Sequence, residues 1–210
     1  MTTEAAETPR ERVFGGAYEC VERFGLGKTT IEDVARASGV SRATIYRLFP
    51  GGRDQLLRET VGWEMNRFFA RLAEAVADLP DLASRLELAL VFARQSVLDH
   101  AVLQKVLVTE PEVLLPLMTI EQHRVVRYIT AYLVPLLGAE RAVGRLDPVV
   151  DLNQAADHLS RMVLSLISSP GRWDLSDPDS VRRLVHQELL GGLLVASDRA
   201  VARPHGEGRV

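Results

Sequence analysis

Apolar residues recur at spacings of three and four along most of the chain, and strand-like alternation of apolar and polar residues is nowhere sustained. That spacing is typical of helices with one buried face. Glycines and prolines interrupt the pattern and predict roughly nine helices. The expected helices span about residues 10–24, 30–37, 41–49, 53–77, 82–99, 101–108, 112–137, 149–168 and 179–197. The fold class is therefore expected to be all-α.

The two ends of the chain are polar and lack this pattern. Residues 1–9 are predicted to form a disordered arm and residues 198–210 a disordered tail. The first residues carry neither a basic start nor an apolar run, so they do not indicate a signal peptide. The apolar runs are also shorter than the roughly 18 residues of a membrane span. These observations predict a cytoplasmic protein.

The stretch from residue 29 to residue 49 combines several local signals. Thr30 can cap a helix, with Asp33 three residues later, and Ser41 can cap a second helix. Gly39 lies between them, where a tight turn needs positive φ. Ile45 would point back to the core from the second helix. The stretch is therefore predicted to be a helix-turn-helix, whose second helix enters the DNA major groove.

The outward side of that second helix carries groups that can contact DNA. Arg42 or Arg47 can donate two hydrogen bonds to a guanine, and the small side chain of Ala43 permits close approach. Hydroxyls can reach phosphates, and a helix N-terminus offers backbone N–H groups to another phosphate. The alternative is a helical hairpin whose arginines are merely solvated. The candidate contacts are Thr29, Thr30, Ser41, Arg42, Ala43, Thr44, Tyr46 and Arg47.

Residues 10–58 resemble the DNA-binding part of TetR-type (TetR/AcrR) regulators, including the signature of Thr44, Tyr46 and Phe49. The run from Asp33 to Thr44 is also similar to the headpiece of LacI-type repressors. A LacI-type chain begins with its helix-turn-helix and continues into an α/β domain. Here one helix precedes the motif, a long helix follows it, and the remainder is helical, which favours the TetR type.

The resemblance implies a helix-turn-helix domain over residues 10–52 and a helical ligand-binding and dimerisation domain over 53–197. It implies a homodimer that binds a palindromic operator, and most commonly a repressor that an effector releases. At Arg53 the family commonly has a lysine, so this residue is expected to meet a phosphate. The expected dimer interface, on the last two helices, comprises Leu159, Val163, Leu166, Ile167, Leu189, Gly191, Gly192 and Leu193.

The resemblance also implies a cavity for a small molecule in the C-terminal domain. Aromatic residues and methionines at helical spacing can line such a cavity, although they are more often plain core. No buried acid or base stands out, which favours an apolar effector. The candidate lining residues are Trp63, Phe68, Phe92, Gln95, His123, Tyr128, Tyr132 and Met162.

Composition and charge narrow the remaining function classes. The net charge of −3 argues against a nucleic-acid binder, but residues 10–60 hold nine basic and seven acidic residues. A single cysteine, Cys20, excludes an intrachain disulfide and a multi-cysteine metal site. The sequence holds no hydrolase, metalloprotease or nucleotide-binding motif, so no catalytic residue, metal or cofactor is predicted. The rival functions are an enzyme and a ligand carrier that inherited the helix-turn-helix.

Overall fold

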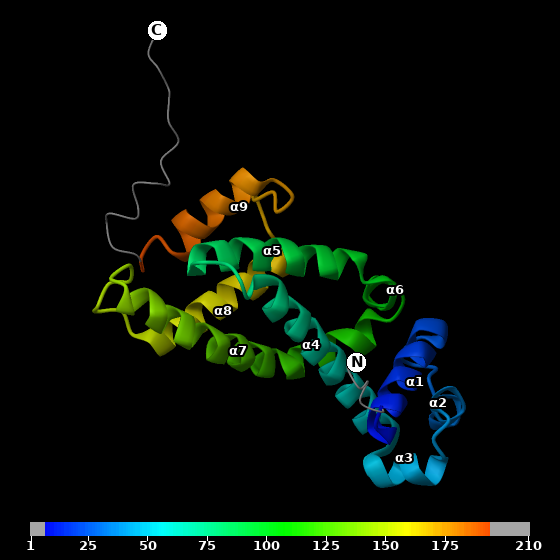
Figure 1. Cartoon of the computed structure of the whole chain (residues 1–210). Helices are drawn as coiled ribbons and strands as arrows, with labels where there is room; N and C mark the ends of the chain where they lie inside the picture. Colours follow the sequence, from blue (N-terminus) through cyan, green and yellow to red (C-terminus); the bar gives the residue numbers. More distant parts are fainter. Residues whose placement is uncertain (1–6, 194–210) are drawn as a thin grey trace, which may run out of the picture. The chain divides into compact units, whose positions relative to one another are not determined.

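A computed structural model describes residues 7–193, apart from the side chains of residues 115–121. The regular elements in this part of the chain are helices, which confirms the all-α prediction (Figure 1). None of them is long and apolar enough to cross a membrane. The helices are α1 (Pro9–Phe24), α2 (Ile31–Ser38), α3 (Arg42–Leu48), α4 (Gly52–Val76), α5 (Leu82–Asp99), α6 (Ala101–Thr109), α7 (Pro111–Ala142), α8 (Leu152–Ser168) and α9 (Pro178–Leu184), the last followed by a π-helical segment (Val185–Leu189).

Helix α1 begins where the predicted arm was expected to end. Thr8 caps it, and a reciprocal contact with Glu11 completes a capping box. Residues 1–6 of the predicted arm and the predicted tail at 198–210 lie outside the described residues. The start of the first helix therefore follows from a local hydrogen-bonding signal.

The chain divides into two compact units, and their boundary differs from the predicted one after residue 52. Unit 1 contains the chain up to Arg71 together with Asp99–Glu121, and unit 2 contains Leu72–Leu98 and the chain from Gln122 onward. Helix α6 and the start of α7 thus belong with α1 to α3. Helical spacing shows that α6 has an apolar face, but it does not show which helix covers that face.

Unit 1 has two neighbouring apolar clusters. The first joins α1, α2 and α3, with Phe14, Ile45 and Phe49 buried in it. The second joins the end of α1 to α4, α6 and α7, and its buried members are Val21, Leu26, Leu57, Val102, Val106 and Leu114. This second cluster is the packing that places α6 in unit 1.

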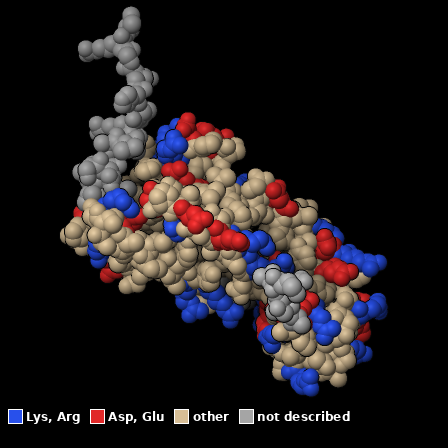
Figure 2. All heavy atoms as spheres, in the orientation of Figure 1, with Lys and Arg blue, Asp and Glu red and all other residues tan. Residues whose placement is uncertain are grey.

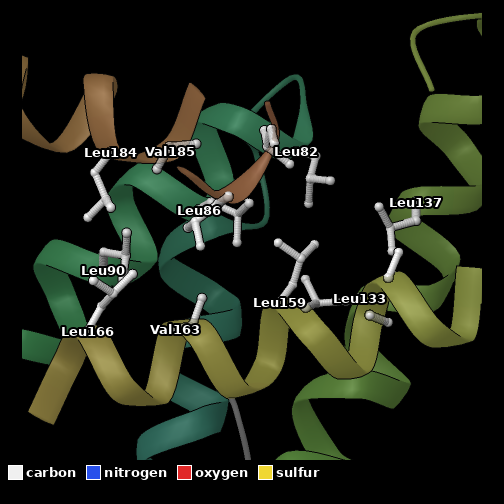
Figure 3. Packing of buried hydrophobic residues seen from close by; sticks show 14 of the residues in the cluster. Leu82, Leu86, Leu90, Leu133, Leu137, Leu159, Val163, Leu166, Leu184 and Val185 are labelled. Atoms are coloured by element: carbon white, nitrogen blue, oxygen red, sulfur yellow. The ribbon is translucent and has the colours of Figure 1, made fainter. Parts of the chain in front are cut away.

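Unit 2 is held by one apolar core between α5, α7, α8 and α9. In Figure 3 the side chains of Leu159, Val163 and Leu166 point from α8 toward α5. At the start of α5, the buried carboxylate of Glu140 accepts a hydrogen bond from Leu82 N at 3.0 Å. The same carboxylate pairs with Arg145. Packing and one buried carboxylate therefore tie α5 to α7.

The core of unit 2 contradicts part of the predicted dimer interface. Leu159, Val163, Leu166 and Leu189 are all buried inside the unit itself. A side chain already covered by its own chain has no surface left for a second copy. These four residues complete the core, while the predicted residues Ile167 and Leu193 are partly buried against it.

Two predicted helix ends were wrong. Helix α7 continues through Pro135 to Ala142, because Leu133 and Leu137 on either side of the proline lie in the same buried core. At the other end of unit 2, regular α-helix stops at Leu184, and the chain has left the helical segment before Gly191.

Gly191 and Gly192 consequently do not lie inside a helix. A Cβ on Gly191 would collide with the carbonyl oxygen of Gln187, whereas one on Gly192 would meet nothing within 4 Å. Glycine at position 191 is thus explained by the turn of its own chain. The predicted packing of two helices against this glycine pair is not supported.

Candidate nucleic-acid interface

Helix α2 starts and stops as its sequence signals predict. Thr30 Oγ1 accepts a hydrogen bond from Asp33 N at 3.2 Å and donates one to Asp33 Oδ2 at 2.6 Å. At the other end, Gly39 has φ of +66°, in the left-handed region where other residues are strained. A Cβ there would meet nothing within 4 Å, so backbone conformation, and not space, explains the glycine.

Helix α3 follows after Ser41, whose hydroxyl accepts a hydrogen bond from Thr44 N at 3.2 Å. Ile45 and the following Phe49 are fully buried and fasten the helix to the core of unit 1. Phe49 packs edge-on against Phe14, with ring centroids 5.6 Å apart. Both ends of this short helix are therefore fixed, and its outward face is presented in one orientation.

The exposed face of α3 carries most of the predicted DNA contacts. Ser41, Arg42, Ala43, Tyr46 and Arg47 are exposed, and Tyr46 retains 47% of its accessible surface although it is aromatic. Thr44 is half-buried. Figure 2 shows Lys and Arg side chains on the surface of α3 and mixed charges over α1 and α2. The structure thus brings donors for bases and phosphates together on one surface.

Arg42 does not stand alone on that surface. Its guanidinium forms an ion pair with Glu32 of α2, with an N–O distance of 2.8 Å. Both side chains are largely exposed, at 60% for Arg42 and 50% for Glu32. Sequence reasoning missed Glu32, because ten residues separate it from Arg42 and only the helix-turn-helix fold brings them together.

Two predicted contacts have structural roles in this conformation. The Thr29 side chain is buried, and its hydroxyl donates to the Gly25 carbonyl at 2.7 Å. The predicted phosphate contact of Thr29 through backbone N–H stays a prediction. The Arg53 guanidinium donates to the carbonyls of Leu26, Gly27 and Thr29, the last at 2.7 Å. Arg53 thereby fixes the loop before α2.

The same loop is held by residues that sequence reasoning missed. Glu110, between α6 and α7, accepts a hydrogen bond from Gly27 N at 2.5 Å. A Cβ on Gly25 would collide with Glu110 Oε1. Lys105 of α6 donates to the Glu22 carbonyl in the last turn of α1, just before this loop, at 2.6 Å. The paired glycines at 25 and 27 were the signal for this close approach, but the sequence did not identify their partner.

Comparison with known proteins agrees with this geometry. The family model described as "Bacterial regulatory proteins, tetR family" matches residues 14–60, from α1 into α4. This match and the relatives below support a TetR-family regulator. The TetR-type resemblance predicted from residues 10–58 is thus confirmed.

Curated relatives of the chain are named as transcriptional regulators, not as enzymes. An uncharacterized HTH-type transcriptional regulator of Mycobacterium tuberculosis is 39% identical over 71 residues, which cover 34% of this chain and 37% of the relative. ArpR of Pseudomonas putida, a probable HTH-type transcriptional regulator, is 28% identical over 186 residues, which cover 86% of each chain.

Solved structures support the same family. The TetR-family repressor AlkX of Dietzia sp. strain DQ12-45-1b, described as implicated in biodegradation of n-alkanes, is 27% identical. The similarity covers 88% of this chain and 96% of AlkX, with a TM-score of 0.60. A TetR-family protein from Mesorhizobium loti shares the fold at 15% identity, with a TM-score of 0.63 and coverage of 92% and 100%.

The predicted effector-binding residues do not form one group. Trp63 stacks on Phe14 against the core of unit 1, with ring centroids 5.7 Å apart, and so lies in a different unit from most of the other candidates. Phe68 also belongs to unit 1 and contacts Phe69. In unit 2, Tyr132 and Met162 pack against the core and Phe92 is half-buried, while Gln95, His123 and Tyr128 are exposed.

The environment of the single cysteine, Cys20, does not favour nucleophilic chemistry. Cys20 is buried in the first cluster of unit 1. Burial, with a smaller contribution from the Asp33 carboxylate, raises the pKa of the Cys20 thiol above its ordinary value. A raised pKa keeps the sulfur protonated at neutral pH and therefore poorly nucleophilic.

Proposed function

We propose that this TetR-family chain is a transcriptional repressor that binds a palindromic operator as a homodimer and releases it when a small, mostly apolar molecule binds unit 2. The observation that carries the proposal is the exposed face of α3, held by a cap at Ser41 and by the buried Ile45 and Phe49. A short helix anchored in this way, with its arginines outward, has the geometry of a recognition helix.

Each group on α3 has a distinct part in the proposed contact. Arg42 and Arg47 supply bidentate donors for guanines, and Ala43 allows the helix to lie deep in the groove and meet a thymine methyl. The hydroxyls of Thr44 and Tyr46 position the helix on phosphates. Thr30 at the start of α2 adds backbone N–H groups to another phosphate. Arg53 acts indirectly, because it holds the loop that precedes α2.

A palindromic operator requires two copies of α3 spaced by one helical turn of DNA, about 34–36 Å. The proposed dimer uses the accessible face of α8, which includes His158, Arg161 and Ser165. The buried leucines of that helix are excluded because they already serve the core. An effector that favours a different spacing of the two α3 helices shifts the population away from the DNA-bound form.

An apolar effector is supported by two observations. The core of unit 2, where α5, α7, α8 and α9 meet, consists mainly of apolar side chains. AlkX, which is similar over most of this chain, is implicated in biodegradation of n-alkanes. Hydrophobic small molecules are therefore the first class of compound to test for release of DNA.

Selection of genomic fragments tests this function. The purified chain is mixed with sheared DNA from its own genome at about 150 mM salt, where nonspecific binding is weak. Enrichment of a few palindromic fragments is expected. If refolded protein, freed of any copurified small molecule, enriches no fragment, the chain is not a sequence-specific regulator, and a ligand carrier becomes the better function.

A further inference from the structure

The ion pair between Glu32 and Arg42 places a carboxylate on the same surface as the recognition helix. Glu32 stands in the first turn of α2, and Arg42 is the first residue of α3. Nothing in the packing of the two helices requires the pair, because both side chains are largely exposed. A carboxylate there repels phosphates, so it lowers the affinity for DNA of any sequence.

The geometry of a guanidinium explains how such a carboxylate can help discrimination. The group has five N–H donors in a planar fork, and a guanine needs only two of them. Glu32 approaches the Nη2 atom of Arg42. The pair can therefore persist while other donors of the fork reach a base, and it limits the directions in which the fork points.

A phosphate contact is affected differently. A phosphate that binds Arg42 must accept a cation already neutralised by Glu32 and must approach the carboxylate itself. Specificity is a difference between two affinities, and a repulsive element against the wrong target increases it. The carboxylate thus weakens contacts with the DNA backbone more than contacts with a base.

We propose that Glu32 is a specificity-determining residue, which holds Arg42 for a guanine and withholds it from phosphates. The proposal rests on the proposed DNA-binding function. An alternative for Glu32 is to stabilise α2, since a negative charge in the first turn of a helix is favourable. That role would change stability without changing discrimination between sequences.

The test compares two duplexes of equal length, one selected by the wild-type protein from a randomised pool and the other a scrambled version. For Glu32→Gln we expect several-fold tighter binding to the scrambled duplex and an affinity ratio between the duplexes about 10-fold smaller. The dependence of log affinity on log salt for the scrambled duplex should steepen by about 0.9, as for one additional phosphate contact.

Two further variants isolate the pair. Glu22→Gln removes the same charge from an exposed position of α1 in unit 1 and should leave the ratio unchanged. In an Arg42→Ala background, Glu32→Gln should no longer change the ratio, because a double-mutant cycle reports the coupling of the two residues. Thermal unfolding of each variant measures the alternative role in helix stability.

Three results would overturn the proposal. The first is an affinity ratio in Glu32→Gln equal to that of the wild type. The second is an equal change of the ratio in Glu22→Gln, which would show that net charge alone causes the effect. The third is a wild-type protein that selects no sequence from the pool, which overturns the proposed function and this proposal with it. The first two results leave the DNA-binding function intact.

Discussion

Both units have helix caps and apolar cores, but in unit 1 side-chain hydrogen bonds from distant residues also fix the loop before two short helices, whereas in unit 2 the long helices meet mainly through apolar packing. In unit 1, Thr30 and Ser41 cap α2 and α3, and Arg53 and Glu110 hold the loop before them. In unit 2, the contacts between helices are mostly leucines and valines. Hydrogen bonds are directional and packing is not, so unit 1 is built to present one surface accurately.

The difference also affects which residues can be replaced. Apolar cores accept changes of shape when volume is kept, because neighbouring side chains can repack. A cap or a positive φ accepts few residue types. We therefore expect conservative apolar changes to be tolerated in unit 2, and small polar or glycine changes to affect the surface of unit 1.

The largest expected effect is in the core of unit 1. Phe49→Ala should destabilise this unit by about 3–5 kcal/mol, because it removes a fully buried ring and leaves a cavity. Chemical denaturation, followed by the fluorescence of Trp63 in unit 1 in a chain whose second tryptophan, Trp173 of unit 2, is replaced by phenylalanine, would measure the loss. Tyr46→Ala, at an exposed position three residues earlier in the chain, should change stability by less than about 0.5 kcal/mol. Equal losses would contradict the assigned core.

The second effect tests the corrected assignment of α8 in unit 2. Leu159→Ala should cost about 2–5 kcal/mol of unfolding free energy, because Leu159 is fully buried within the unit. Leu164→Ala, at a half-buried position of the same helix, should cost less. Denaturation at several protein concentrations gives the measurement. A loss that vanishes at high concentration would return Leu159 to a dimer interface.

A smaller effect is expected where α6 meets the loop of unit 1. Glu110→Ala removes the acceptor for Gly27 N and should cost about 1–2 kcal/mol, since a hydrogen bond to a charged group is lost at a partly exposed site. Affinity for a selected duplex should decrease as well, because this loop leads into α2. Glu112→Ala, an exposed neighbour, is the control. Unchanged amide exchange at Gly27 would contradict the contact.

The smallest effect concerns the turn between α2 and α3. Gly39→Ala should cost about 1 kcal/mol, because its φ of +66° is strained for alanine. Gly39→Asn should cost less, since asparagine tolerates this conformation better. Thermal unfolding of the two variants provides the comparison. If they are equally stable, the positive φ does not explain the glycine.

The sequence allowed correct predictions where a residue acts on its near neighbours in the chain. Thr30, Gly39 and Ser41 each act on a backbone group within four residues, so their roles follow from spacing alone. The same holds for Ile45, whose burial follows from helical periodicity. These residues predicted the helix-turn-helix and most of its exposed face.

Long-range partners were not available from spacing. Leu159 and Trp63 are apolar residues at helical positions, and the sequence does not tell a core position from an interface or a cavity. Arg53 and Glu110 act on a loop about 26 and 83 residues away in the chain, respectively, which only the folded chain brings near. The ion pair of Glu32 with Arg42 was missed for the same reason.

The proposed function depends most directly on recognition of DNA sequence by the exposed face of α3. The measurement is the affinity of the wild-type chain and of Arg42→Ala and Arg47→Ala for a selected duplex and for its scrambled version. We predict that the wild type prefers the selected duplex by about 1,000-fold or more. At least one variant should lose about 1–3 kcal/mol on the selected duplex and less on the scrambled one. Wild-type affinity of both variants for the selected duplex would contradict the assignment of α3 as the recognition helix.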